Sequence, residues 1–219
     1  MEQKNLIFDF DSTLLKMETI EVLAEITLHD NKNKNIILEE IKNITNLAMS
    51  GKMPFSKALK KRISLLDIQT IHIDKTINFL KNELSNSFYE TIENFEMYSD
   101  NIFIVSGGFK EIIYPILKPY GFNEKNIFAN TFLTSKKGAL TIDETNALSK
   151  DKGKVSIVNN ISGYNIIIGD GYTDYELKKF GGAKEFVLFV ENIYRKELKD
   201  KANYIAKNFN DVFEYINNV

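Results

Sequence analysis

Four short apolar segments constrain the fold of this chain more than any other feature of its sequence. Each has the length and the Ile, Val and Phe content of a buried strand. The segments are NLIFDF (5–10), NIFIVS (101–106), YNIIIGD (164–170) and EFVLFV (185–190). Segments with helical periodicity follow the last three, at 109–121, 172–182 and 193–202. This alternation predicts an α/β fold with a parallel sheet flanked by helices on both faces.

The stretch between the first two strands differs from the rest because it contains one helical pattern after another. The patterns cover 18–29, 35–51, 54–66 and 74–84. Within them, Gly51 suits a helix C-cap and Pro54 suits the first position of the next helix. We therefore expect a small helical lobe inserted after the first strand, above the edge of the sheet. Between the second and third strands we expect a short strand at 126–132 and a hairpin around 134–140.

The overall composition excludes several classes of protein. The chain has 219 residues, of which 43% are hydrophobic and 26% charged, and its formal net charge is −2. This balance gives no general attraction to nucleic acid or to an anionic membrane. The absence of cysteine removes disulfides and thiolate chemistry, and two histidines, His29 and His72, are too few for a histidine-based centre. No apolar run approaches the roughly 18 residues of a membrane span, and the first ten residues lack a signal-peptide pattern, so we expect a cytoplasmic protein.

Polar residues lie where the predicted strands end, which is where ligands bind in open α/β sheets. At the end of the first strand, Asp9 and Asp11 are two residues apart, so an extended backbone directs them to the same side. Two like charges this close require a cation, and hard oxygen ligands select Mg²⁺. Read alone, the pair also fits two exposed loop carboxylates or a helix N-cap.

Three further strand ends carry polar groups that suit a phosphate site. Ser106 with Gly107 and Gly108 offers a hydroxyl and unobstructed N–H groups, although the same residues are also compatible with a plain glycine turn. Lys152, beside Gly153, is placed to neutralise a phosphate and a carboxylate, although most isolated lysines are only solvated. Asp170 ends a strand and Asp174 falls on the next helical turn, which gives a second acidic cluster. The joint placement of all four groups favours a site over chance.

The collected groups suit phosphoryl transfer, because cations and donors surround the place of a trianionic centre. Cysteine is absent, histidine is scarce and no Walker-type loop is present, so an aspartate is the expected nucleophile. Asp9 can approach a phosphate once Mg²⁺ and Lys152 reduce the repulsion. Asp11 can then protonate the leaving alkoxide and later deprotonate a water.

The four motifs DFDST, SGGF, DKGK and GDGYTD resemble those of the haloacid dehalogenase superfamily. Within it, the chain resembles the phosphoserine phosphatase family along nearly its whole length, because MSGKMPFSKALKKR, NIFAN and IDET also match. The resemblance implies a Rossmann-like core formed by 1–16 and 88–219, with a helical cap at 17–87. It also implies Mg²⁺-dependent hydrolysis of O-phosphoserine through an aspartyl-phosphate, and a place in serine biosynthesis.

The resemblance also assigns roles to individual positions. It implies that Asp9 is nucleophile and metal ligand, that Asp11 is the acid/base and a ligand through its carbonyl, and that Asp170 is the third ligand. The expected supporting residues are Asp174 for the metal's water shell, Ser106, Gly107, Gly108, Lys152 and Thr173 for the phosphate or substrate, and Glu18, Met49, Phe55 and Arg62 for substrate binding in the cap. Two positions depart from the family pattern, since Met17 replaces a common acidic residue and Ser50 a common glycine.

The cap residues fit a zwitterionic substrate. Arg62 can grip a carboxylate with two hydrogen bonds, Glu18 can pair with an ammonium, and Met49 and Phe55 can exclude water. Read without the resemblance, these residues also fit a basic helix face and cap packing.

Three rival functions remain at the level of sequence: a phosphatase for another small phosphomonoester such as phosphoethanolamine, a receiver-type phospho-acceptor module, and a metal- and phosphate-binding protein without turnover. In each case we expect no nucleic-acid or membrane partner, and a monomer or a homodimer.

Overall fold

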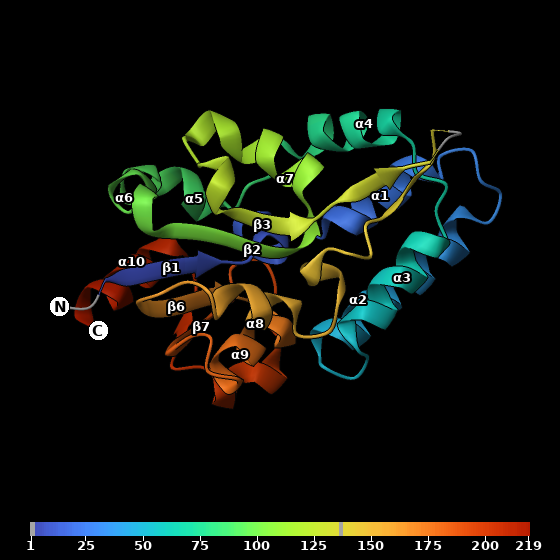
Figure 1. The fold of residues 1–219 in the computed structure, drawn as a ribbon. Helices are drawn as coiled ribbons and strands as arrows, with labels where there is room; N and C mark the ends of the chain where they lie inside the picture. Colours follow the sequence, from blue (N-terminus) through green and yellow to red (C-terminus); the bar gives the residue numbers. More distant parts are fainter. Residues whose placement is uncertain (1–2, 136–137) are drawn as a thin grey trace.

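A six-stranded parallel sheet forms the centre of the molecule (Figure 1). The computed structural model describes residues 3–135 and 138–219. Its strands are β1 (Lys4–Phe8), β2 (Ile102–Phe109), β3 (Ile127–Asn130), β6 (Tyr164–Gly169), β7 (Glu185–Phe189) and β8 (Tyr204–Ala206). They lie in the order β3-β2-β1-β6-β7-β8, and every neighbouring pair is parallel. This order is that of a doubly wound Rossmann-type sheet, so the predicted α/β class is confirmed.

Helices cover both faces of the sheet because alternate strand residues face opposite sides. The helices that cover the two faces are α5 (Asn86–Glu90), α6 (Ile92–Met97), α7 (Lys110–Leu117), α8 (Gly153–Val158), α9 (Tyr172–Lys179) and α10 (Phe209–Asn218). On one face, Leu6 and Phe8 of β1 belong to a core that includes α7 and α10. On the other, Ile7 belongs to a core that includes α8 and α9. Full burial of all three side chains explains why β1 reads as a continuous apolar run.

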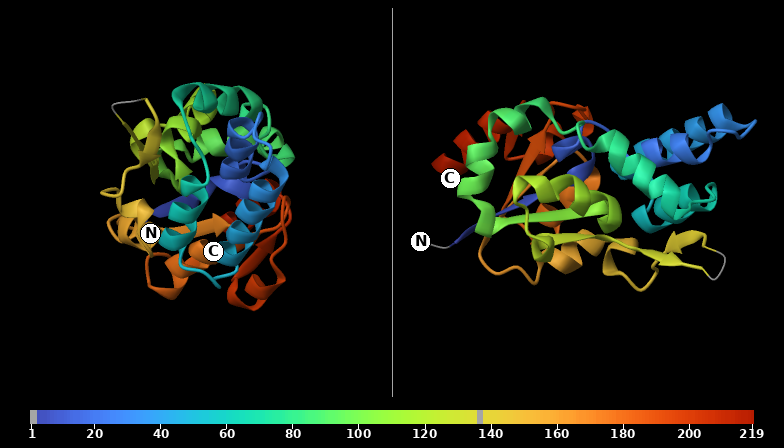
Figure 2. Two further views of the ribbon diagram at one scale, coloured as in Figure 1. Left: turned by 90° about the vertical axis from the view of Figure 1, so that its right-hand side faces the viewer. Right: turned by 90° about the horizontal axis from the view of Figure 1, so that it is seen from above.

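Four helices from the stretch between β1 and β2 lie near the carboxyl ends of the strands (Figures 1 and 2). They are α1 (Thr19–Thr27), α2 (Lys34–Met49), α3 (Phe55–Ser64) and α4 (Thr70–Leu80). They correspond to the four predicted helices, although α4 begins and ends four residues before the predicted range 74–84. Leu23, Leu59 and Leu80 extend the core of the sheet into this group. Gly51 follows α2 with φ +74°, as a C-terminal glycine requires, whereas Pro54 is the N-cap of α3 rather than its first residue.

A hairpin of β4 (Phe132–Thr134) and β5 (Leu140–Ile142) follows β3, as predicted. Residues 136 and 137, between these two strands, lie outside the described residues. The helix predicted at 193–202 is wrong: the structure has only a 3₁₀ helix, Lys196–Lys201. Arg195 and Leu198 are buried here, and their spacing of three matches the 3₁₀ period, so no α-helical stripe is available to pack.

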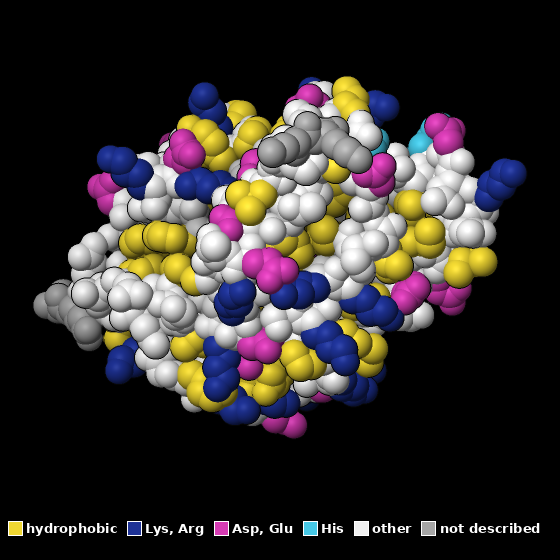
Figure 3. Space-filling view, turned by 45° about the vertical axis from the view of Figure 1, so that its right-hand side comes forward, with side chains coloured by type: hydrophobic (Ala, Val, Ile, Leu, Met, Phe, Trp, Pro, Cys, Tyr) yellow, Lys and Arg dark blue, Asp and Glu magenta, His cyan; other side chains and the backbone are white. Residues whose placement is uncertain are grey.

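The charge distribution agrees with a mixed surface. On the face drawn in Figure 3, Lys and Arg side chains are interspersed with Asp and Glu. Within the part of the chain that the structure describes, no helix is both long enough and apolar enough to cross a bilayer.

Candidate active site

The site lies where β1 and β6 end side by side, at the point where the winding of the sheet reverses. Asp9 directly follows β1, and Asp170 directly follows β6. The Asp9 N–H donates to the Ile168 carbonyl (2.9 Å), which continues the β1–β6 ladder as far as Asp9. Parallel pairing therefore brings two carboxylates 161 positions apart in the sequence to one edge of the sheet.

A tight turn at 10–14 controls how Asp9 is presented. Asp9 Oδ1 accepts from the Phe10 N–H (2.7 Å), and Ser12 has a left-handed backbone with φ +55°. Phe10 and Leu14 are fully buried and fix the turn to the core. The Asp9 side chain is consequently held at the edge of the pocket with only 7% of its surface exposed.

Three buried carboxylates form a group that could hold a metal ion. Asp9, Asp170 and Asp174 each offer an oxygen, and these oxygens lie within 4.8 Å of one another. Burial, followed by the charge of Asp9, raises the pKa of Asp174 to about 7. Burial also raises the pKa of Asp170 well above its ordinary value, although Arg195 opposes this shift. Such mutual repulsion among hard oxygen donors is the environment that a divalent cation relieves, so the residues fit a metal site.

The structure corrects the predicted position of the site lysine. Lys154, not Lys152, lies between two of these carboxylates, with its Nζ 2.9 Å from Asp9 Oδ1 and 2.7 Å from Asp174 Oδ1. Burial alone would lower the pKa of Lys154, but Asp174 and Asp9 outweigh burial and raise it. Lys152 is exposed, and its ammonium lies over the Phe180 ring at 4.0 Å from the ring centroid.

The backbone around Gly153 explains why Lys154, and not Lys152, enters the site. A Cβ at Gly153 would lie 2.4 Å from the Ala147 carbonyl oxygen, so this residue packs directly on the preceding loop. Lys152 precedes it with φ +58°, and α8 begins at Gly153. The first turn of α8 then directs Lys154 inward, toward the end of β1.

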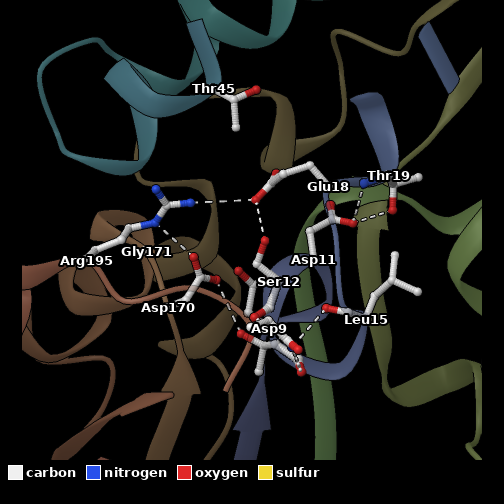
Figure 4. Close-up of polar contacts among 12 residues, drawn as sticks. Asp9, Asp11, Ser12, Leu15, Glu18, Thr19, Thr45, Asp170, Gly171 and Arg195 are labelled. Carbon is white, nitrogen blue, oxygen red and sulfur yellow. Dashed lines mark hydrogen bonds and ion pairs between the residues drawn. The ribbon is translucent and has the colours of Figure 1, made fainter. Parts of the chain in front are cut away.

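Asp11 lines the same pocket as Asp9 but has a different environment. Its Oδ1 accepts from the Thr19 N–H (2.9 Å) and from the Thr19 hydroxyl (Figure 4). Burial and the charge of Glu18 raise the pKa of Asp11 to about 8, against the hydrogen bonds from Thr19. The Asp11 carboxyl thus retains its proton near neutral pH, whereas Asp9 is paired with a buried ammonium.

The predicted phosphate loop lies opposite these carboxylates. The strand does not stop at Ser106 as expected, because β2 continues through an irregular register to Phe109, which pairs with Asn130. Ser106 Oγ accepts from the Gly108 N–H (3.0 Å), and the Asn130 side-chain amide donates to the Gly107 carbonyl (2.9 Å). A Cβ at Gly107 would lie 2.7 Å from the Phe55 ring, so a side chain there would have to displace the ring.

Thr173 completes this end of the pocket. Its Oγ1 is buried and finds no hydrogen-bond partner among the described residues, and the residue lines the pocket wall. An unpaired buried hydroxyl costs free energy unless a ligand or water satisfies it. Thr173 is therefore available to a bound anion.

Residues of α2 and α3, with Glu18 at the N-cap of α1, form the opposite wall of the pocket. Glu18, Met49, Phe55 and Arg62 all line it, as the sequence predicts. Ser50 and Met17, the two positions that depart from the family pattern, are not among the lining residues. The Ser50 hydroxyl donates to the Leu47 carbonyl (3.2 Å), and Met17 packs against the core.

One ion-pair network was not predicted. Arg195, 7% exposed, donates from Nε to Asp170 Oδ2 (2.9 Å) and lies 3.8 Å from Glu18 Oε1 (Figure 4). The same Glu18 oxygen accepts from the Ser12 hydroxyl (2.9 Å). Because Arg195 falls in the stretch expected to be an α-helix, no strand-end signal marks it in the sequence.

Fold and site together are those of a phosphatase of the haloacid dehalogenase class. No family model matches the chain. A phosphoserine phosphatase from Methanocaldococcus jannaschii is 30% identical over 225 residues, with 98% of each chain covered. The chloroplastic phosphoserine phosphatase of Arabidopsis thaliana is 29% identical over 208 residues, which cover 92% of this chain and 68% of the relative.

Solved structures give the same result. A phosphoserine phosphohydrolase-like protein from Francisella tularensis is similar with a TM-score of 0.89 and 32% identity, covering 98% of this chain and all of the other. A phosphoserine phosphatase solved as an analogue of its phospho-aspartyl intermediate has a TM-score of 0.79 and 28% identity, with 98% and 99% covered. The chain belongs to the phosphoserine phosphatase family.

Proposed function

We propose that this protein is a Mg²⁺-dependent phosphatase that hydrolyses O-phospho-L-serine to L-serine and phosphate through an aspartyl-phosphate on Asp9. The observation that carries the proposal is one pocket lined both by the Asp9–Lys154 cluster and by Arg62 and Glu18. The first group suits a phosphate and the second suits the zwitterionic end of an amino acid. Its relatives are phosphoserine phosphatases, one of them solved with its substrate bound, which supports the same substrate.

The wall formed by the helices would select the substrate. Arg62 is almost fully buried, so its guanidinium can bind the substrate carboxylate with little competition from water. Glu18 would pair with the ammonium. Met49 and Phe55 would cover the reacting centre and exclude water from it, which strengthens the electrostatic interactions inside.

In the first half of the reaction, Asp9 would attack the phosphorus atom and the bond to the serine oxygen would break. Lys154 would reduce the repulsion between the Asp9 carboxylate and the phosphate. Asp11, whose raised pKa keeps it protonated near neutral pH, would donate a proton to the departing serine alkoxide. Ser106, Gly107 and Thr173 would bind the phosphate oxygens, and Gly108 would orient Ser106 by donating its N–H to the Ser106 hydroxyl oxygen (3.0 Å).

In the second half, the deprotonated Asp11 would take a proton from a water that attacks the aspartyl-phosphate. This step releases phosphate, regenerates the Asp9 carboxylate and returns Asp11 to its protonated form. One residue would therefore serve as acid and then as base, which a pKa near the working pH favours.

Mg²⁺ would be held by the carboxylates of Asp9 and Asp170 and by the backbone carbonyl of Asp11. When bound, it would neutralise charge on the phosphate and on the nucleophile. Asp174 fits a supporting position better than a direct ligand, because its Oδ1 accepts from Lys154 (2.7 Å) and its Oδ2 accepts from the Gly171 N–H (2.9 Å). It would orient Lys154 and the water around the metal.

The division into a core (1–16 and 88–219) and a cap (17–87) belongs to the same proposal, as do a cytoplasmic location and a monomeric or homodimeric state. Ser56 of α3 donates its N–H to Asp151 (2.9 Å), and Lys60 pairs with Glu144 (2.7 Å). These contacts would fasten the cap over the pocket and would break if it opened. Serine biosynthesis would be the corresponding pathway role.

Phosphate release from a panel of substrates tests the proposal. The panel holds O-phosphoserine, phosphothreonine, phosphoethanolamine and a sugar phosphate, each with and without Mg²⁺. We expect O-phosphoserine with Mg²⁺ to have the highest kcat/KM, and Arg62→Ala to reduce turnover of O-phosphoserine far more than that of an aryl phosphate. A preference for phosphoethanolamine would contradict the assignment, and a single stoichiometric phosphorylation without turnover would indicate a phospho-acceptor module.

A further inference from the structure

Arg62 is held at two of its nitrogens before any substrate binds. It lies on α3 with 3% of its surface exposed. Its Nε donates to the Ala58 carbonyl, one turn earlier on the same helix (3.3 Å). Its Nη1 donates to Thr45 Oγ1 on α2 (3.0 Å). Among the described residues, no hydrogen bond from Nη2 is found, and Nη1 keeps a second hydrogen, so both terminal nitrogens can donate to the pocket that Arg62 lines.

Thr45 is itself fixed in one orientation. Its side chain is 1% exposed, and its hydroxyl donates to the Ile41 carbonyl, four residues earlier on α2 (3.1 Å). A hydroxyl has one hydrogen, so the bond to Ile41 leaves only lone pairs for the guanidinium. In the view of Figure 4, Thr45 lies above the group that contains Glu18 and Arg195. The threonine therefore acts as an oriented acceptor for one arm of Arg62.

We propose that Thr45 is a positioning residue for substrate selection, which, together with the Ala58 carbonyl at Nε, sets the plane of the Arg62 guanidinium so that it meets the substrate carboxylate with two hydrogen bonds. This inference rests on the proposed function, in which Arg62 binds that carboxylate. A guanidinium presents its donors in a rigid plane, so a rotation of the plane weakens both bonds to a carboxylate together. The carboxylates of Glu18, Asp11 and Glu21 attract the guanidinium. Among the described residues none of them is hydrogen-bonded to it, so they do not fix this plane.

Thr45→Val tests the inference because valine keeps the shape and removes the acceptor. The readouts are kcat and KM for O-phosphoserine and for p-nitrophenyl phosphate, which has neither a carboxylate nor an ammonium. We expect KM for O-phosphoserine to rise roughly tenfold to a hundredfold, the loss typical of a hydrogen bond to a charged group. We expect kcat to change less than about threefold and the aryl phosphate kinetics to be unchanged, since phosphate binding is not altered.

The chain offers a matched control in Thr76. Thr76 is also fully buried on a helix of the same group, and its hydroxyl also donates to the carbonyl four residues earlier, that of His72 (2.8 Å). Thr76→Val therefore removes the same kind of hydroxyl without an arginine partner, and both substrates should be turned over as in the wild type. Thr45→Ser, which restores the acceptor, should restore KM for O-phosphoserine.

The outcomes separate the inference from the proposed function. If the wild type turns over O-phosphoserine but Thr45→Val leaves its KM unchanged, or weakens both substrates equally, the positioning role is wrong and the proposed function stands. If Thr45→Val has the same effect in an Arg62→Ala background as in the wild type, Thr45 does not act through Arg62. If the wild type does not hydrolyse O-phosphoserine, the proposed function fails and the inference fails with it.

Discussion

Replacement of Lys154 by methionine tests which lysine serves the site. The structure assigns this role to Lys154, whereas the sequence predicts Lys152. Lys154 Nζ contacts Asp9 at 2.9 Å and Asp174 at 2.7 Å, and the side chain is 8% exposed. Methionine keeps much of the length and removes the charge. We expect Lys154→Met to lose most of its turnover, and Lys152→Met to keep turnover within about threefold of the wild type, because the Lys152 ammonium lies outside the carboxylate cluster.

The size of the effect follows from the burial of the pair. Coulomb's law gives about 6 kcal/mol for each of these contacts at an effective dielectric constant of roughly 20, as an upper bound. Removal of one partner of a buried pair typically costs about 3–5 kcal/mol of folding stability, so Lys154→Met should also unfold at a lower temperature. Removal of one preorganised donor at a site of developing charge typically lowers kcat by roughly 10² to 10³, and we expect a fall of this size.

The assay is steady-state phosphate release from O-phosphoserine at saturating Mg²⁺, with circular dichroism and thermal unfolding to verify that each variant is folded. Lys154→Arg serves as a partial rescue that retains the charge. Normal kcat in a folded Lys154→Met, or a loss confined to Lys152→Met, would refute the assignment and would return the role to Lys152.

Three further predictions address the nucleophile, the metal and the pocket shape. Asp9→Asn should abolish turnover while the variant still folds and binds phosphate, measured by phosphate release and isothermal titration; full activity would remove Asp9 as nucleophile. Burial raises the pKa values of Asp11 and Asp174 to about 8 and about 7, above the 3.8 of an ordinary aspartate. The native state without metal therefore binds more protons than the unfolded state, and its stability should fall as pH rises from about 4 to about 8. In EDTA we expect a lower Tm at pH 8 than at pH 5.5, and Mg²⁺ should raise Tm more at pH 8; the opposite pH trend would contradict the account. Gly107→Ala would place a Cβ 2.7 Å from the Phe55 ring, and overpacking of this kind costs about 1–3 kcal/mol of folding stability, so Tm should fall. Because Phe55 lines the pocket, its displacement should also lower kcat/KM; wild-type Tm and kinetics would show that the ring moves freely.

Much of the fold and part of the site could be predicted from the sequence, because the topology of the sheet determines where the residues that follow each strand lie. A parallel sheet brings the carboxyl ends of its strands to one edge, so the positions of Asp9 and Asp170 follow once β1 and β6 are recognised. The last helix was also readable, although it was not predicted. Phe209, Val212, Phe213 and Ile216 recur at the spacing of an amphipathic helix, and all four are buried in α10.

Other features depend on contacts that no local pattern contains. Lysines flank Gly153 on both sides, and only the packing of Gly153 on the Ala147 carbonyl decides which of them enters the site. Arg195 reaches Asp170 from the loop after β7, and its burial follows from the path of that loop rather than from its neighbours in sequence. The three residues of β8 are too few for periodicity to distinguish a strand from a loop.

Direct detection of the covalent intermediate tests the central claim. The enzyme is mixed with O-phosphoserine and Mg²⁺, quenched within milliseconds, and treated with borohydride, which reduces an acyl-phosphate to an alcohol. Peptide mass spectrometry should find homoserine in place of aspartate at position 9, and only in samples that received substrate. Turnover without any reduced residue, or reduction at Asp11 or Asp170 with Asp9 intact, would contradict the account.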